Sequence, residues 1–215
     1  MRPVRPRILL FPFSPGFDIC LPYMADIDDD ELLRAFGAVA LDFSEVEELL
    51  VSHTAKLVDP NDQGVGLATL AGLDFRKILE IFDTLVRERT SLRYTMVRNP
   101  PYANAEQIHD RLKPLVSRID KVREQRNHVF HAYWRPTFTY DADSDSFIRT
   151  PGAAESIRHQ KKTGCGYIDT RKIWTLGELQ TISAEVREVA RQLKDFVMWA
   201  NTLGAKHKLF PEEEY

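Results

Sequence analysis

Apolar residues recur at steps of three and four residues along most of this chain, and this period is typical of amphipathic helices. One such segment follows the acids of "DIDDDELL", a second runs from about Leu67 through "LDFRKILEIFDTLVRE", and a third ends in "VREQRNHVF". The last begins at "TLGE", where Thr175 and Glu178 have capping-box spacing. Pro114 is expected to kink or divide the third helix. The stripes of the first, third and last segments are Leu32, Phe36, Val39, Phe43, Val46 and Leu50; Ile108, Leu112, Leu115, Ile119, Val122, Val129 and Tyr133; and Leu179, Ile182, Val186, Val189, Leu193, Phe196, Ala200 and Leu203.

Residues 136–174 have a different pattern. The runs "TFTY", "SFIRT" and "YIDTRKIW" favour strands, and "DADSD", "PGAA" and "KKTGCG" separate them as turns. The predicted fold is therefore mainly α, a four-helix bundle with a small β-hairpin or sheet inserted before the last helix. The length of 215 residues and the hydrophobic content of 43% fit a single domain, residues 1–215, with a proline-rich arm (1–27) and a polar C-terminal tail (205–215).

Charge and composition exclude several classes of protein. A net charge of -3 excludes a globally basic nucleic-acid binder, so any RNA contact must use a local patch. Prolines interrupt the apolar N-terminal run, which excludes a signal peptide and a membrane helix, and we expect a cytoplasmic protein without a membrane partner. Cys20 and Cys165 leave one disulfide open but favour reduced thiols. No cluster has metal-ligand spacing, so neither metal nor cofactor is expected.

Arg126 occupies an unusual position on the third helix. At 100° per residue, five apolar residues lie within about 40° of Arg126, so its guanidinium falls on the buried face; they are Ile108, Leu115, Ile119, Val122 and Tyr133. A cation there is costly unless it is paired or used. Glu47 lies on the apolar side of the first helix and is the candidate partner. The simplest interpretation is a structural Arg126–Glu47 ion pair without chemistry.

Two polar neighbours favour a chemical role instead. Asn127 and His131 are four residues apart and share a helix face, about 100–140° from Arg126. The long arginine side chain can reach that face, or it can meet the histidine of a symmetry mate. A permanent cation, an amide and an acid/base imidazole together suit phosphoryl chemistry. The angular separation predicts a symmetric homodimer whose interface includes the end of this helix.

The segment "RNHVFH" resembles the R-x4-6-H motif of the HEPN superfamily. "FSEVEELL" in the first helix, the aromatic exit "AYW" and the final amphipathic helix resemble HEPN proteins in the same order, over about residues 31–204. The resemblance implies a homodimeric, metal-independent endoribonuclease of the toxin or antiviral-defence kind, with RNA as substrate. It assigns His131 as general acid/base, Arg126 as the group that stabilises the phosphorane, and Asn127 as a positioning residue. Some members of the superfamily are non-catalytic binding or scaffold modules.

A second resemblance concerns Tyr133, because "RNHVFHAY" also fits the R-x4-H-x-Y pattern. In HEPN toxins that are paired with an MNT-type nucleotidyltransferase antitoxin, this tyrosine is the nucleotidylated position. The resemblance therefore implies such an antitoxin as a partner. The alternative is a core tyrosine, since Tyr133 falls on the apolar stripe of the third helix. His128 points away from His131 in this projection and is predicted at the surface.

The insertion carries a run of basic residues. Candidate RNA-binding side chains are Arg149, Arg158, Lys161 and Lys162, with Arg171 and Lys172 nearby in sequence. A solvated, charged turn is the alternative interpretation of this run. Two other functions also stay open beside the ribonuclease: a non-catalytic HEPN-type module, and a helical regulator that binds a small ligand, in which Arg126 belongs only to a buried ion pair.

Overall fold

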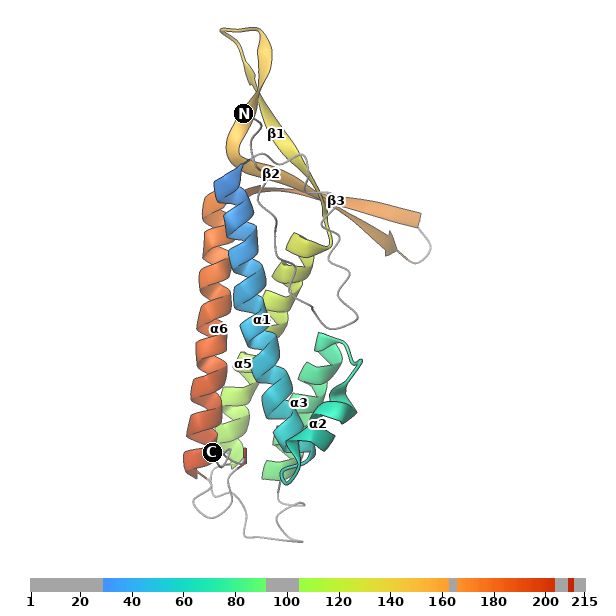
Figure 1. The fold of residues 1–215 in the computed structure, drawn as a ribbon, viewed down its shortest axis with the longest axis vertical. Helices are drawn as coiled ribbons and strands as arrows, with labels where there is room; N and C mark the ends of the chain where they lie inside the picture. Colours follow the sequence, from blue (N-terminus) through green and yellow to red (C-terminus); the bar gives the residue numbers. More distant parts are fainter. Residues whose placement is uncertain (1–28, 92–104, 163–165, 204–208, 211–215) are drawn as a thin grey trace, which may run out of the picture.

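The computed structural model describes residues 29–91, 105–162, 166–203 and 209–210 of the chain. It is mainly helical, with a small antiparallel sheet before the last helix (Figure 1). The helices are α1 (Asp30–Val58), α2 (Gln63–Leu70), α3 (Phe75–Thr90), α5 (Ala105–Phe130) and α6 (Leu176–Leu203). The strands are β1 (Tyr133–Asp141), β2 (Ser146–Lys162) and β3 (Gly166–Thr175).

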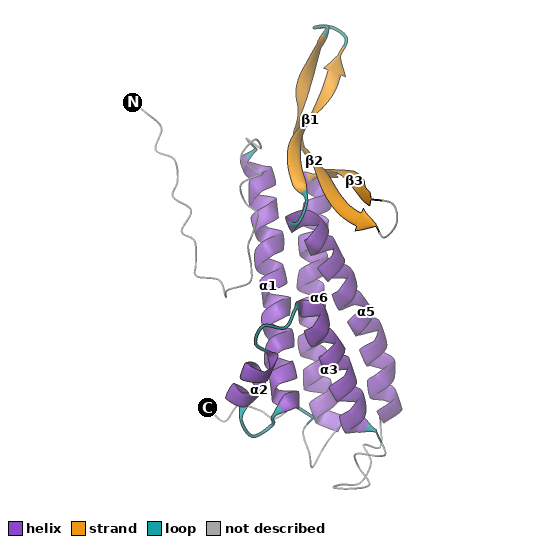
Figure 2. Cartoon of the chain, turned by 90° about the vertical axis from the view of Figure 1, so that its right-hand side faces the viewer, coloured by secondary structure: helices purple, strands orange, loops and turns teal. Residues whose placement is uncertain are grey.

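The long helices α1, α3, α5 and α6 lie side by side, and α2 packs against the end of α1 (Figures 1 and 2). The predicted stripes of α1, α5 and α6 form the core between them, except that Tyr133 lies outside α5 and Leu203 is only partly buried. Asp42 and Glu45 of α1 contact Ser183 and Lys194 of α6 along the edge of this core. Helical periodicity therefore located the bundle correctly.

One predicted helix was wrong, and of the two effects expected of Pro114 one, division of its helix, is not observed. The segment from Leu67 onward is two helices, because the chain turns at Gly72, whose φ of +80° suits glycine, and Asp74 then caps α3. Pro114 does not divide the third segment, since α5 runs through it without a break.

Aspartates begin three of the helices. The carboxylates of Asp29, Asp62 and Asp74 each accept a hydrogen bond from the backbone N–H three residues later, at 3.0, 3.2 and 2.8 Å. The predicted capping box of α6 is confirmed. Thr175 N–H donates to Glu178 Oε2 at 2.8 Å, and Glu178 N–H donates to Thr175 Oγ1 at 3.2 Å.

The sheet has the order β1-β2-β3, and both pairs are antiparallel. "PGAA" was expected to be a turn but lies inside the long strand β2. Gly152 there has a φ of +65°, and the β1–β2 register shifts between Pro136 and Phe138. A β-bulge bends and twists a strand pair. The outer parts of β1 and β2 accordingly form a hairpin that projects away from the bundle (Figure 2).

Two buried tryptophans anchor the inner part of the sheet to the helices. Trp134 of β1 donates to the Val129 carbonyl at 2.7 Å and meets the Phe36 ring edge-on, with centroids 4.4 Å apart. Trp174 of β3 donates to Ser156 Oγ at 2.8 Å. These contacts hold the start of β1 directly beside the end of α5.

Asp29 makes a second connection between the sheet and the bundle. While one of its oxygens caps α1, the other accepts the Gly152 N–H at 2.8 Å. These backbone donors, Leu32 first, lower the pKa of Asp29 below its ordinary value. One carboxylate therefore fixes both the first turn of α1 and the middle of β2.

The expected polar tail contains an apolar anchor. Leu209 and Phe210 are buried, and Phe210 stacks on Phe82 with centroids 6.0 Å apart. Asn201 holds the Phe210 backbone through two hydrogen bonds, at 2.7 and 2.8 Å. The proline-rich arm (1–27), Cys20 and Cys165 lie outside the described residues. In the described part of the chain, every helix is too short or too polar to cross a membrane.

Candidate functional site

The three motif residues meet where α5 ends. The Nη1 atom of Arg126 lies 3.2 Å from Asn127 Oδ1 and 3.2 Å from His131 Nε2. The Arg126 guanidinium also lies over the rings of Phe43 and Phe130, at 5.5 and 5.4 Å from their centroids. Aromatic rings on two sides thus hold the cation where both polar neighbours reach it.

The angular separation of Arg126 and His131 was predicted from a continuing helix, but α5 ends at Phe130. His131 lies in a bend and keeps only its N–H bond to the Asn127 carbonyl, at 3.0 Å. Its imidazole therefore meets Arg126 of the same chain, and the angular argument for a homodimer no longer applies.

The Arg126 contact defines the protonation of His131. A guanidinium can only donate hydrogen bonds, so Nε2 accepts, and the neutral imidazole carries its proton on Nδ1. Burial lowers the pKa of His131, and the nearby charges of Arg126 and Arg158 lower it further. The imidazole is consequently neutral over a wider pH range than an ordinary histidine, which is the form that a general base requires.

The motif residues line a cavity of about 680 Å³ between α1, the α2–α3 turn and the end of α5. Glu47 of α1 lines the same cavity, and its charge interacts with that of Arg126. Burial raises the pKa of Glu47, and the Arg126 charge partly opposes this effect.

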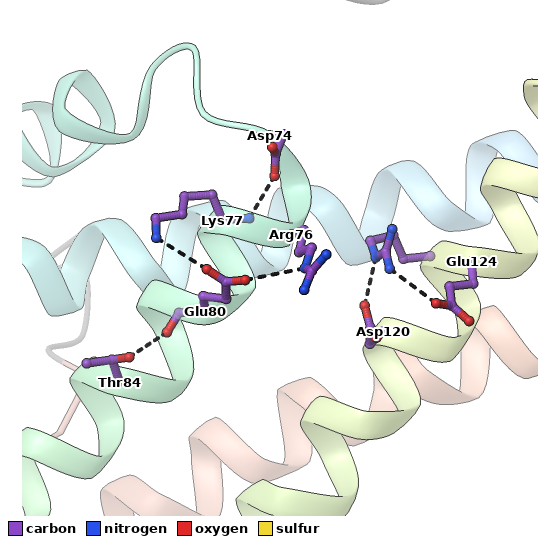
Figure 3. Close-up of polar contacts among 8 residues, drawn as sticks. Asp74, Arg76, Lys77, Glu80, Thr84, Asp120 and Glu124 are labelled. Carbon is purple, nitrogen blue, oxygen red and sulfur yellow. Dashed lines mark hydrogen bonds and ion pairs between the residues drawn. The ribbon is translucent and has the colours of Figure 1, made fainter. Parts of the chain in front are cut away.

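Two further arginines line the cavity and were not identified from the sequence. Arg123 of α5 pairs with Asp120 at 2.7 Å and Glu124 at 3.6 Å, and Arg76 of α3 pairs with Glu80 at 3.3 Å. Figure 3 draws these contacts, each of which joins residues of one helix. Arg123 lies three residues before Arg126, which was a detectable signal. Arg76 lies beside these residues only because α3 packs near α5, and no sequence spacing indicates this.

The basic residues of the insertion do not all lie together in the structure. Arg158 of β2 is half-buried, and its charge lowers the pKa of both His128 and His131. Arg158 forms no ion pair with another described residue. Arg149 lies instead near Asp29, whose pKa it helps to lower. The side chains of Lys161 and Lys162 lie outside the described residues. Of the two candidates whose side chains are described, Arg158 is thus the one that the fold brings near the motif.

Two predicted placements near the motif were wrong. Tyr133 is not a core residue of the third helix, because it begins β1 and its side chain is 39% exposed. His128 is not at the surface, since it is half-buried against Trp174, with ring centroids 5.5 Å apart. Burial lowers the pKa of His128, as do the charges of Arg158 and Lys172.

No group of three histidine, cysteine or carboxylate side chains is arranged to hold a metal ion among the residues that the structure describes. No protein-family model, curated protein or solved structure matches the chain. The geometry of Arg126, Asn127 and His131 at one cavity is therefore the basis for a functional conclusion.

Proposed function

We propose that this chain is a metal-independent endoribonuclease of the HEPN type, acting as a toxin or in antiviral defence. The observation that supports the proposal is the contact of Arg126 with both Asn127 and His131 in the lining of a cavity of about 680 Å³. It joins a permanent cation, which suits a phosphate, to a neutral imidazole, which suits a proton acceptor.

The proposed reaction uses the RNA itself as the nucleophile. His131 Nε2 takes the proton of a ribose 2′-OH, whose oxygen attacks the adjacent phosphorus. The bond from phosphorus to the 5′-oxygen breaks, this leaving oxygen takes a proton from a water molecule, and His131 returns its own proton to solvent. The products are a 2′,3′-cyclic phosphate and a 5′-hydroxyl. Arg126 stabilises the negative charge that develops on the phosphorane oxygens, and Asn127 positions the phosphate or the imidazole.

Substrate binding and proton transfer are linked in this arrangement. Nε2, the atom that must accept the 2′-OH proton, receives a hydrogen bond from Arg126 in the structure. A phosphate binds a guanidinium through two parallel hydrogen bonds and competes for the same donors. The arriving phosphate therefore releases His131 from Arg126 at the moment when the base is needed.

Cleavage of mixed RNAs by wild-type protein and by His131→Ala tests the proposal. Loss of the general base should slow cleavage about 10²–10⁴-fold and leave the thermal melt unchanged. Arg126→Lys keeps the charge but loses the planar fork, so it should fold and cleave poorly. The matched control is His109→Ala, on the same helix but bonded to Thr90 at 2.8 Å. Wild-type rates in His131→Ala would refute the catalytic role.

The proposed chemistry also specifies the products and the ion requirement. Because the nucleophile is internal to RNA, cleavage should continue in chelator and leave 2′,3′-cyclic phosphate ends. Activity that is lost in chelator and restored by magnesium or manganese would contradict this mechanism. Mass spectrometry of a short RNA substrate identifies the ends directly.

A second candidate function is a non-catalytic HEPN-type module, and the charge interaction between Arg126 and Glu47 favours it. In such a module Arg126→Ala would lower the melting temperature, His131→Ala would have no effect, and RNA would stay intact. The same set of variants therefore separates the two functions.

The proposal includes an antitoxin of the MNT nucleotidyltransferase type that modifies Tyr133. Tyr133 lies two residues after His131 and is 39% exposed, which leaves part of the residue accessible to a second protein. Transfer of a nucleotide would add a negative charge beside the motif. Loss of the modified mass in Tyr133→Phe, after incubation with the nucleotidyltransferase and ATP, is the test.

A further inference from the structure

The cavity beside the motif has an apolar wall that cleavage of a phosphodiester does not require. Arg126, Asn127 and His131 lie on its α5 side. Apolar side chains from the other elements line much of the rest, beside the charged Glu47, Asp74 and Arg76. They are Phe43 and Val51 of α1, Leu67 and Leu70 of α2, Leu73 of the α2–α3 turn, and Phe75 and Ile78 of α3. The cavity therefore offers a polar side for an anion and an apolar side for another part of the same ligand.

Several of these apolar side chains remain accessible. Leu67 and Leu73 are 41% and 39% exposed, although they are large hydrophobic residues beside a cavity. The volume of about 680 Å³ falls within the roughly 300–1,000 Å³ that is usual for small-ligand sites. An apolar group of a ligand would remove this surface from water and gain affinity from its burial.

Two aromatic rings lie on the apolar side. Phe43 and Phe75 have ring centroids 5.0 Å apart; Phe43 is buried, and Phe75 is half-buried at the first position of α3. The Arg126 guanidinium is 5.5 Å from the Phe43 ring. One ligand that carries an anion next to a flat ring system can therefore contact the cation and the rings together.

We propose that this cavity binds the nucleobase of the nucleotide that carries the scissile phosphate, with Phe75 stacking on the base. This inference rests on the proposed function, since it takes the anion at Arg126 to be an RNA phosphate. Every base has a π-face, so stacking on an aromatic side chain gives affinity whatever the sequence. The apolar wall, which holds Leu67 and Leu73, encloses the base from the side of α2 and the α2–α3 turn.

Isothermal titration with the four nucleoside 3′-monophosphates and with inorganic phosphate tests the inference. The nucleotides should bind more tightly than inorganic phosphate to the wild-type protein. Phe75→Leu keeps an apolar side chain but removes the flat ring, so it should raise the Kd of the nucleotides. The expected factor is about 5- to 150-fold, which is a stack of about 1–3 kcal/mol converted at 1.4 kcal/mol per tenfold. The Kd of inorganic phosphate should not change.

Two other variants make the test specific. Phe147→Leu is the matched control, because Phe147 is a 72% exposed aromatic residue on β2, in the projecting hairpin and outside the cavity. Leu73→Asn places a polar amide on the cavity wall at an exposed position that the fold tolerates, and it should weaken nucleotide binding as well. Thermal melts of all variants identify any loss of folding.

Two outcomes would overturn the inference. They are equal Kd values for nucleotides and inorganic phosphate, and a Phe75→Leu variant that binds nucleotides like Phe147→Leu in a folded protein. Cleavage of RNA together with base-independent binding overturns this inference alone. Base-dependent binding by a protein that cleaves no RNA supports the cavity as a nucleotide site and overturns the proposed nuclease.

Discussion

The close packing of α2 on α1 leaves no space for a side chain at Gly66. A Cβ atom there would lie 2.7 Å from the carbonyl carbon of Ala55 and 2.9 Å from its Cα. Backbone atoms cannot rotate away, so Gly66→Ala must push α2 from α1. Overpacking lowers the free energy of unfolding by about 1–3 kcal/mol, and we expect a value near 3 kcal/mol because the backbone of α1 cannot move aside. Alanine has a higher helix propensity than glycine by about 1 kcal/mol, so the net loss in the free energy of unfolding is about 2 kcal/mol.

Thermal melting of Gly66→Ala beside Gly37→Ala measures this effect. Gly37 lies in α1 with nothing within 4 Å of its added Cβ, so its alanine variant gains helix propensity alone. For a domain of this size about 1 kcal/mol corresponds to 2–4 °C. Gly66→Ala should therefore lower the melting temperature by about 4–8 °C, and Gly37→Ala should raise it by about 2–4 °C. Equal shifts in the two variants would refute the packing of α2 described above.

Three further predictions concern charge and assembly. Backbone N–H groups hold the pKa of Asp29 below its ordinary value of 3.8, so its stabilising effect is present at neutral pH and disappears as the pH falls through the lowered pKa. Asp29→Ala should cost about 0.5–2 kcal/mol at pH 7, and urea unfolding should show this difference vanish in strong acid. Because the Arg158 charge lowers the pKa of His131, Arg158→Gln should move the acidic limb of the kcat/KM profile to higher pH, while Arg149→Gln should not move it. By its HEPN resemblance the chain should be a homodimer, so light scattering at micromolar concentration should give about twice the 24.8 kDa chain mass, and a single chain mass would exclude this state.

The helices of this fold were predictable because burial repeats with the helical period. Each predicted stripe residue of α1, from Leu32 to Leu50, is buried in the structure. Local signals also marked features that were missed, since Gly72 and Asp74 separate α2 from α3, and the apolar pair Leu209–Phe210 interrupts the polar tail. Patterns within about four residues therefore carry most of the secondary structure.

The candidate site was predictable only in part. Arg126, Asn127 and His131 were identified from residue type and spacing, but whether Arg126 meets His131 of its own chain or of a second copy was left open, because the answer depends on the end of α5 at Phe130. The cavity, the arrival of Arg76 and the approach of Arg158 require the tertiary packing of distant segments. Residue spacing within one segment does not predict which residues of a distant segment will pack beside it.

Because α1 packs against α6, part of its apolar stripe is covered only after α6 has been synthesised. The two helices lie side by side along the bundle, yet Leu203 is added about 145 residues after Val58 (Figure 1). At a synthesis rate of about 5–20 residues per second, roughly 7–30 s pass between the completion of α1 and the completion of α6. During that interval α3 and α5 can already pack on α1, but the apolar side chains that face α6 stay uncovered. The α1 helix that supplies part of the cavity wall packs on α6, so the proposed nuclease stays incomplete until α6 has been made.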